Sequence, residues 1–289
     1  MADLPRSQIS FEQAEGVQPL PQQMALGTLS RPLRALLCDA TLNSIKADMA
    51  ADGRRVSLGP GWESTFRRYF LERGVFPNKI SVEFKYVSSV LSEIFDKSTY
   101  AAILGMVEFF ARNLASAKVR VSYVNAVSAH LERQACAYRL IDGSILPIAS
   151  PEEGQAIYQA MDSLAARGLS GARGHLLRAG SALTAAEYAD SIRESIHAVE
   201  STARALTGKG SLREALNEIA AIHPMHPALK EGLNRIYGYT NDANGIRHPI
   251  VSEDGPQAGE DEALFMFGAC ASFITYLARI GPKPATQPL

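Results

Sequence analysis

Arg247 and His248 are adjacent in the segment YGYTNDANGIRHPI, which covers residues 237–250. A guanidinium binds a phosphate group in a bidentate manner, and an imidazole donates or accepts a proton near neutral pH. Pro249 follows directly and disfavours a helix at His248. The functional interpretation is a phosphate-binding Arg247 beside an acid or base, His248. The structural alternative is that Arg247 pairs with a carboxylate of a neighbouring helix and His248 is a hydrogen-bonded interface residue.

The residues before this pair predict a sharp turn and add candidate ligands. Asn and Asp side chains bond to nearby amides and accept left-handed backbone conformations, as glycine does. The residues of these types are Asn241, Asp242, Asn244 and Gly245. We assign Asp242 and Asn244 to substrate binding. Tyr237 and Tyr239 could stack on nucleic-acid bases, although tyrosines at a helix end more often serve packing, and Tyr239 joins the candidate substrate-binding residues.

A second group of polar residues lies on one predicted helix, DSIRESIHAVES, residues 190–201. Spacings of three and four residues place four side chains on one face: Asp190, Arg193, His197 and Glu200. In the functional interpretation, His197 is a catalytic residue that faces a cleft with a carboxylate, and Arg193 and Glu194 bind substrate. The alternative is a solvated face crossed by ion pairs between residues three and four apart.

Other residues that bind metals in proteins lack suitable partners in this sequence. His223 and His226, in the segment IHPMHP, have no carboxylate or cysteine nearby. The three cysteines, Cys38, Cys136 and Cys270, show no CxxC spacing. Their pattern favours buried thiols in a reducing compartment. We therefore expect no metal ion and no cofactor.

Two further segments have simple structural interpretations. Gly168, Gly171 and Gly174 predict a turn, because a phosphate loop would need a preceding strand and a following GK[ST] motif. Basic residues outnumber acidic ones between residues 51 and 85, seven to four. This segment is either a face for a partner or nucleic acid, or a solvated surface, and the second interpretation is the more common one.

The chain has 289 residues and a formal net charge of −1. This length favours two domains, and the charge means that any nucleic-acid site is a local patch. The apolar stretch ALFMFGACASFITYLARI, residues 263–280, is interrupted by small and polar residues and predicts a buried helix. The first residues do not have the pattern of a signal peptide. We expect a cytoplasmic protein that does not contact a membrane.

The elements that must position these residues are mostly helices. Apolar residues recur at helical spacing through both halves of the chain, and Asp142-Gly143 predicts a type I′ hairpin between them. The predicted helix caps and ends are Ser30, Ser150 with Glu153, Thr184 with Glu187, Gly74 and Gly208. We therefore predict an all-α fold of two helical modules joined by a short β-hairpin. Its parts are a flexible lead-in at 1–28, a helical domain at 29–137, the hairpin linker at 138–149, a helical domain at 150–281 and a flexible tail at 282–289.

Several of these segments are similar to the AbiJ-type abortive-infection proteins of bacteria. The similarity is carried by YRLIDGSILPI, ADSIRESIHAVESTARALTG and HPALKEGLNRIYGYTNDANGIRHPI, and it extends from about residue 25 to about residue 280. One departure is Cys38, where the family leads us to expect tryptophan. The resemblance implies that the second module is a HEPN-like helical bundle. It also implies a homodimer that acts in phage defence or a toxin–antitoxin system.

Active HEPN proteins cleave RNA without a metal ion, using an arginine followed by a histidine after four to six intervening residues. This sequence departs from that signature. Three residues separate Arg193 from His197, none separates Arg247 from His248, and five separate Asp242 from His248. The resemblance thus suggests a displaced HEPN site with His248 as acid or base and Arg247 as phosphate binder. Arg193, Glu194 and His197 would complete a cleft near a dimer axis.

The sequence leaves more than one function open. The first is an anti-phage endoribonuclease with RNA as its partner. The second is a non-catalytic HEPN-like module that binds, senses or scaffolds, with a phage-derived or other protein as its partner. A small-ligand or nucleotide site is a third interpretation, and no motif supports it.

Overall fold

The structure is a computed structural model of the chain and describes residues 11–15, 17, 22–51, 53, 56–242 and 258–282. The chain divides into two compact units, Met1–Ile145 and Leu146–Leu289. The boundary between them lies inside the segment 138–149, where we predict the hairpin. As predicted, the described residues are mostly helical and include one two-stranded sheet.

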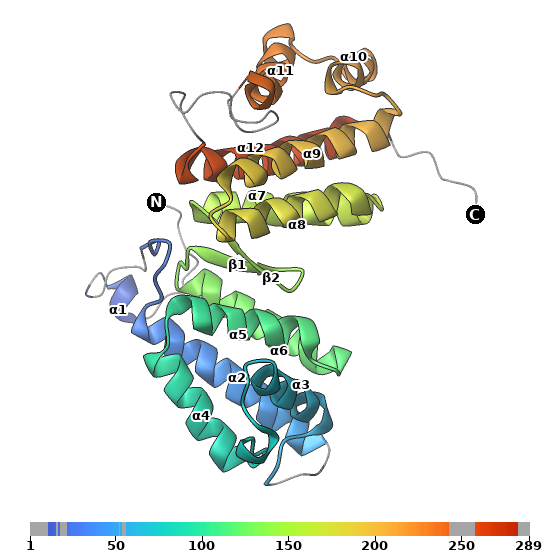
Figure 1. Ribbon diagram of the computed structural model, residues 1–289. Coiled ribbons are helices and arrows are strands. Elements are labelled where there is room, and N and C mark those ends of the chain that lie inside the picture. The colour runs from blue at the N-terminus through green and yellow to red at the C-terminus, as the bar shows by residue number, and fades with distance from the viewer. Residues whose placement is uncertain are drawn as a thin grey trace, which may run out of the picture. The chain divides into compact units, whose positions relative to one another are not determined.

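Unit 1 is a helical unit (Figure 1) in which α2 contacts α3, α4 and α6, and α5 contacts α3 and α6. Its elements are α1 (Phe11–Ala14), α2 (Arg31–Ala51), α3 (Pro60–Leu71), the 3-10 helix η2 (Pro77–Lys79), α4 (Phe84–Lys97), α5 (Tyr100–Asn113), α6 (Ala117–Arg133) and β1 (Tyr138–Ile141). Ser30 caps α2 as predicted, because its hydroxyl accepts a hydrogen bond from the Leu33 amide at 3.3 Å. Helix α3 ends at Leu71, before the predicted stop at Gly74.

The core of unit 1 is built around Trp62, which is fully buried. Its ring meets Phe110 and Tyr123 edge to face, with centroids 5.0 and 5.4 Å away. Its indole N–H donates to the Ser44 hydroxyl at 3.1 Å, so the buried polar atom is satisfied. Trp62 is therefore both buried and hydrogen-bonded, and from α3 it contacts α2, α5 and α6.

Part of the predicted lead-in at 1–28 is attached to unit 1. The Met24 amide donates to the Ala135 carbonyl at 2.8 Å. The Gly27 amide donates to the Tyr138 hydroxyl at 2.9 Å. Residues 22–28 are therefore bound to the α6–β1 segment, which corrects the prediction of a loose lead-in for them. Backbone hydrogen bonds of this kind are not visible in the polar composition on which that prediction rested.

The hairpin forms as predicted, from β1 and β2 (Ser144–Pro147). Asp142 and Gly143 have φ angles of 51° and 75°. Positive φ at both central residues is the requirement of a type I′ turn. Both strands are buried along their whole length.

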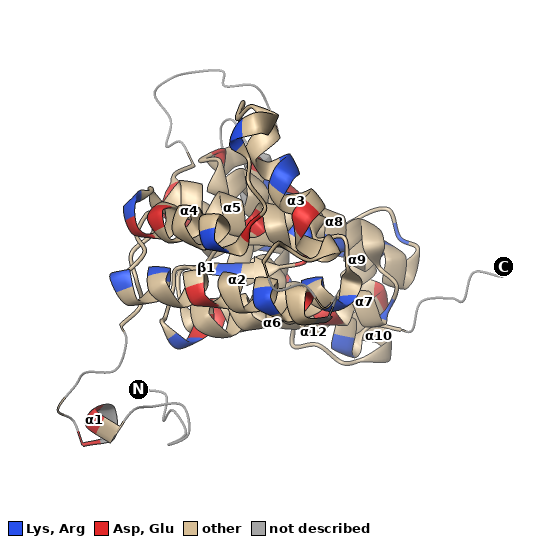
Figure 2. Cartoon of the chain, turned by 90° about the horizontal axis from the view of Figure 1, so that it is seen from below, with Lys and Arg blue, Asp and Glu red and all other residues tan. Residues whose placement is uncertain are grey.

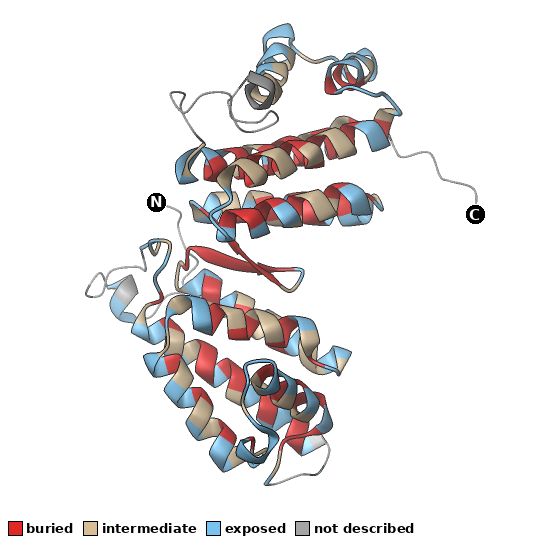
Figure 3. Cartoon of the chain, in the orientation of Figure 1, coloured by how far each residue is buried: buried red, intermediate tan, exposed pale blue. Residues whose placement is uncertain are grey.

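Unit 2 packs four helices against one another, α7, α8, α9 and α12, and α10 and α11 lie against α9 (Figure 1). The bounds are α7 (Pro151–Ala166), α8 (Ser170–Thr184), α9 (Tyr188–Thr207), α10 (Leu212–Ile222), α11 (Pro227–Asp242) and α12 (Glu260–Ile280). Buried residues follow stripes along the four packed helices (Figure 3).

Helix α12 confirms the prediction of a buried apolar helix at 263–280. Among the described residues it is the one helix with the length and composition to cross a membrane, and 61% of its apolar window is buried in the protein. Phe267, Cys270 and Ile274 are among its fully buried residues. Three acidic residues, Glu260, Asp261 and Glu262, occupy its first turn, where the helix dipole stabilises negative charge.

Two helix ends in unit 2 follow the predicted chemistry. The Ser150 hydroxyl accepts from the Glu153 amide at 3.1 Å and caps α7. The Glu153 carboxylate in turn accepts from the Ala149 amide at 2.6 Å. Gly208 ends α9 in the left-handed conformation, with φ of 73°.

The predicted cap at Thr184 is wrong. Thr184 is the last residue of α8, and its hydroxyl donates to the Gly180 carbonyl at 2.9 Å. Ala186 then takes a positive φ of 60°, and α9 starts at Tyr188 after Glu187. A threonine can satisfy its hydroxyl inside the preceding turn as well as at a following N-terminus, and here the first option prevails.

Gly180 allows α8 to lie close to strand β2. A Cβ atom at this position would lie 2.6 Å from Cδ2 of Leu146, which is closer than real Cβ contacts. We expect Gly180→Ala to destabilise the protein by about 1–3 kcal/mol through overpacking. Gly232→Ala is the matched control, because Gly232 lies in α11 and no described residue comes within 4 Å of its Cβ position. Urea denaturation should show the control equal to or more stable than the parent; equal stability of both variants would contradict this account.

Glu153 provides a pH-dependent prediction. Burial raises the pKa of its carboxyl group above the ordinary value near 4.5, although the amides of Ala149 and Ser150 oppose the shift. Its Oε1 atom is buried beside Gly268 of α12 and has no hydrogen bond among the described residues. The folded state therefore keeps this proton to higher pH than the unfolded state, so ionisation above about pH 4.5 reduces stability.

Glu153→Gln should consequently gain stability relative to the parent at pH 7–8, and the gain should shrink as the pH falls toward 4.5. Thermal or urea denaturation across this pH range measures the difference. Glu152→Gln, in the same turn but exposed, controls for the loss of one negative charge. If the stability difference between Glu153→Gln and the parent does not change with pH, burial does not raise the pKa of Glu153 and this account is wrong.

Candidate functional site

Helices α8 and α9 run side by side, and small residues let them approach closely. Gly171 of α8 lies against α9, where its Cβ position is 3.4 Å from the Ser201 hydroxyl. The buried hydroxyls of Ser195 and Thr202 donate to carbonyls of their own helix, both at 2.8 Å. These polar atoms are satisfied within α9 and do not hold the helices apart. Polar side chains at the edge of this contact can therefore meet.

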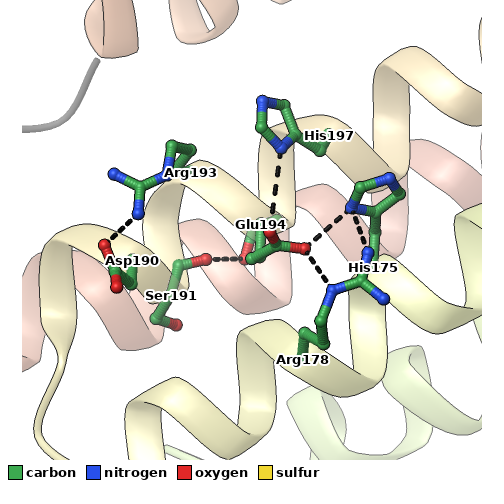
Figure 4. A network of polar contacts seen from close by, with 8 residues as sticks. His175, Arg178, Asp190, Ser191, Arg193, Glu194 and His197 are labelled. Carbon is green, nitrogen blue, oxygen red and sulfur yellow. Dashed lines mark hydrogen bonds and ion pairs between the residues drawn. The ribbon is translucent and has the colours of Figure 1, made fainter. Parts of the chain in front are cut away.

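The side chains that meet there are gathered around Glu194 (Figure 4). Oε2 of Glu194 accepts from Nε of Arg178 at 3.0 Å and lies 2.7 Å from Nδ1 of His175. Oε1 of Glu194 lies 3.9 Å from Nδ1 of His197. Two residues of α8 and one other residue of α9 thus contact the Glu194 carboxylate. We call His175, Arg178, Glu194 and His197 the Glu194 cluster.

The Nδ1 atom of His175 has two competing neighbours. It lies 2.7 Å from Glu194 Oε2 and 2.8 Å from Nη2 of Arg178. A ring nitrogen that carries a proton donates to the carboxylate, and one that carries none accepts from the guanidinium. The position of the His175 proton is therefore coupled to Arg178. The His175 and His197 rings stand edge to face, with centroids 5.3 Å apart.

The Glu194 cluster is partly buried and open to solvent. The side chains of Glu194, His175 and His197 are 22%, 28% and 34% exposed, and that of Arg178 is 57% exposed. Partial burial alone would raise the pKa of Glu194, but the hydrogen bonds from His175 and Arg178 outweigh it and lower the pKa. The carboxylate is therefore held in its charged form between groups that carry or accept protons.

Sequence analysis placed His197, Arg193 and Glu194 in one site, and the structure locates all three on the same side of α9 (Figure 4). Arg193 pairs with Asp190, three residues earlier, and His197 lies near Glu194, also three residues away. These contacts within one helix are those of the ion-paired alternative. The contacts from His175 and Arg178 of α8 go beyond that alternative, because they bring a second helix to the same carboxylate.

The remaining predicted residues lie at or after the end of α11. Tyr239 and Asp242 belong to α11, which runs to Asp242, so Asn241 and Asp242 are helical and do not form the predicted sharp turn. Asn244, Arg247 and His248 lie outside the described residues. Helical hydrogen bonding of the preceding turns thus continues through residues whose types favour turns.

Tyr237 fixes the last part of α11 to α9. Its hydroxyl donates to Oε1 of Glu200 at 2.6 Å, and both side chains are half-buried. Glu200 lies three residues after His197 on α9. The tyrosine that sequence analysis weighed for base stacking is used for packing between helices.

Two other predicted features are structural in the described residues. The glycine turn is limited to Gly168, with φ of 69°, because Gly171 and Gly174 lie inside α8. In the basic segment, Arg67 pairs with Glu63 and Arg68 with Glu72. Basic and acidic residues are interspersed along the helices (Figure 2), as on a solvated surface.

Sequence analysis missed His175 and Arg178. A usable signal was present, since the two residues are three apart in ARGHLLRAGSAL and so share a helix face. The nearby glycines, Gly168, Gly171 and Gly174, predicted a turn in this segment and not a helix face. That this face meets Glu194 is a tertiary contact, which spacing within one helix cannot reveal.

Comparison with protein-family models, with curated proteins and with solved structures gave no match for this chain. The resemblance to abortive-infection proteins therefore stays a prediction from the sequence.

The Tyr237–Glu200 bond should hold α11 on α9. In a double-mutant cycle of Tyr237→Phe and Glu200→Gln, we expect a coupling of about 1 kcal/mol or more, because the acceptor is charged and half-buried. Hydrogen exchange of the α11 amides measures the local free energy of opening. The matched control is the exposed pair Arg235 and Glu231, whose side chains are 81% and 54% exposed, with an expected coupling of about 0.3 kcal/mol. Equal coupling in the two cycles would contradict the anchoring role.

Proposed function

We propose that this chain is a HEPN-like abortive-infection protein that cleaves RNA without a metal ion, in the cytoplasm and as a homodimer. The observation that carries the proposal is the Glu194 cluster, in which two imidazoles from different helices stand 5.3 Å apart beside a shared carboxylate. Imidazoles are the side chains best suited to exchange protons near neutral pH. The sequence resemblance supplies RNA as the substrate.

The chemistry needs two proton transfers. One imidazole removes the proton of a ribose 2′-hydroxyl, whose oxygen attacks the adjacent phosphorus. The bond from phosphorus to the 5′-oxygen breaks, and the second imidazole gives that oxygen a proton. The products are a 2′,3′-cyclic phosphate and a 5′-hydroxyl, and no water or metal is consumed. His175 and His197 are the acid and base in the described part of the chain.

The guanidiniums would stabilise the charge on phosphate. Arg178 is 57% exposed and tied to Glu194, and Arg193 is 35% exposed and pairs with Asp190. Such exposed pairs are weak, at about 0–1 kcal/mol, so a phosphate can take the place of either carboxylate. The proposal keeps His248 as a further acid or base and Arg247 as a further phosphate binder, with Tyr239, Asp242 and Asn244 as substrate-binding residues.

The non-catalytic alternative is a HEPN-like module that binds, senses or scaffolds. It is favoured by the same two arginines, because both already pair with carboxylates of their own chain. Under this alternative the cluster joins α8 to α9 and has no proton to transfer. The two functions differ in whether bound RNA is cut.

The test is incubation of the purified chain with labelled RNAs, with and without a chelator. We expect cleavage that the chelator does not reduce, and a fall of about 100-fold or more in His175→Ala and in His197→Ala. His248→Ala and Arg247→Ala test the second pair in the same assay. The control is the double variant of His223 and His226, both exposed and outside the cluster.

Three outcomes separate the possibilities. Unchanged cleavage by both cluster variants would exclude the cluster as the catalytic site. Cleavage abolished by the chelator would refute a metal-independent reaction. RNA binding without cleavage by the parent chain would favour the non-catalytic module. Circular dichroism of each variant shows whether a loss of activity comes from unfolding.

A further inference from the structure

The geometry points to a metal-binding capacity of the same cluster: His175, Glu194 and His197 form a zinc site. Each residue offers one ligand atom, and these atoms all lie within 4.8 Å of one another. Two come from α9, where Glu194 and His197 are three residues apart, and one comes from α8. Sequence analysis expected no metal, and a ligand that comes from a different helix is not visible in the spacing along one helix.

The observed separations are near those of a zinc site. Ligand atoms about 2.0–2.1 Å from a tetrahedral zinc ion lie roughly 3.3 Å from one another. Nδ1 of His175 is 2.7 Å from Oε2 of Glu194, and Nδ1 of His197 is 3.9 Å from Oε1. These two pairs, which involve the two different oxygens of Glu194, differ from the zinc spacing by about 0.6 Å each. With one ligand atom per residue, all separations lie within 4.8 Å, so the three side chains need shifts of up to about 1.5 Å, within the reach of side-chain rotation. Partial burial of the three side chains leaves a route for the ion from solvent.

The choice of ion follows from the ligand types. Two imidazole nitrogens and one carboxylate oxygen are a ligand set of catalytic zinc sites, in which the fourth position holds water or a ligand. Magnesium and calcium prefer sites made of oxygen atoms only. The cluster therefore favours zinc over these two ions.

Arg178 occupies the place of a cation in the described arrangement. Its Nε contacts Oε2 of Glu194 and its Nη2 contacts Nδ1 of His175, which are two of the three ligand atoms of the proposed site. Its side chain is 57% exposed, so it can turn into solvent. An exposed ion pair of this kind is weak, so its loss costs little stability. Arg178 thus competes with the ion, and its removal should strengthen zinc binding.

Zinc binding also has a consequence for the proposed function. A ring nitrogen that binds a metal ion cannot transfer a proton, so zinc should inhibit cleavage by His175 and His197. This consequence rests on the proposed RNA cleavage, whereas zinc binding itself does not. The two can therefore fail separately.

The binding experiment is calorimetric titration of the untagged, full-length chain with zinc chloride. Exposed His223 and His226 could bind zinc independently, so both are replaced by alanine in the background protein. We expect one equivalent of zinc per chain, and at least 10-fold weaker binding after His175→Ala, His197→Ala or Glu194→Gln. Magnesium chloride in place of zinc chloride should give no binding at this site.

The Arg178→Ala variant tests whether Arg178 competes with zinc for Glu194 and His175. We expect it to bind zinc several-fold more tightly than the background protein. Arg193→Ala is the matched control, because it removes the same charge from a residue paired with Asp190, and it should strengthen binding less. Equal affinity of the background protein, His175→Ala and His197→Ala would overturn the zinc site, as would weaker binding by Arg178→Ala.

The thermal melt of each variant, with and without zinc, shows whether the variant is folded. Zinc should raise the Tm of the background protein, since an ion that binds only the folded state stabilises it, and the variants of the three ligands should lose this rise while keeping a cooperative melt. In the RNA assay, zinc should inhibit the background protein and the chelator should restore cleavage. Zinc binding without any RNA cleavage would refute the proposed function and leave the zinc site intact.

Discussion

The close approach of α8 to α9 is the constraint on which the Glu194 cluster depends. Gly171 lies against Ser201, and the hydroxyls of Ser195 and Thr202 donate to carbonyls of their own helix. His175 follows Gly171 by four residues and lies on the same side of α8. The packing of small residues in the interior therefore sets the position of a polar site at its edge.

Much of the fold could be predicted from the sequence, because its signals are local. Helical periodicity, the Asp142-Gly143 turn and the Gly208 stop each depend on a few neighbouring residues, and each is present in the structure. The errors arise where one residue has two local options. Thr184 satisfies its hydroxyl inside α8 and does not cap α9, and α11 continues to Asp242 through turn-forming residues.

The site was predictable only within a single helix. Spacing along α9 predicted a shared face for Arg193 and His197, but it also suited an ordinary ion-paired surface, and the Arg193–Asp190 pair is of that kind. His175 and Arg178 join the group through a tertiary contact that no spacing rule contains. These two residues change the chemistry of the site. Within α9 the Glu194 carboxylate lies near one imidazole, that of His197, and with α8 it also contacts a second imidazole and a guanidinium.

The central claim is that Glu194 holds His175 and His197 in one site. Nitrogen-15 NMR of the imidazole rings tests it most directly, with each histidine assigned by substitution. Glu194→Gln should move the ring resonances of both His175 and His197 and leave those of His223 and His226 in place, because only the first two contact the carboxylate. If His175 does not respond, α8 does not contribute to the site, and the account of a shared cluster is wrong.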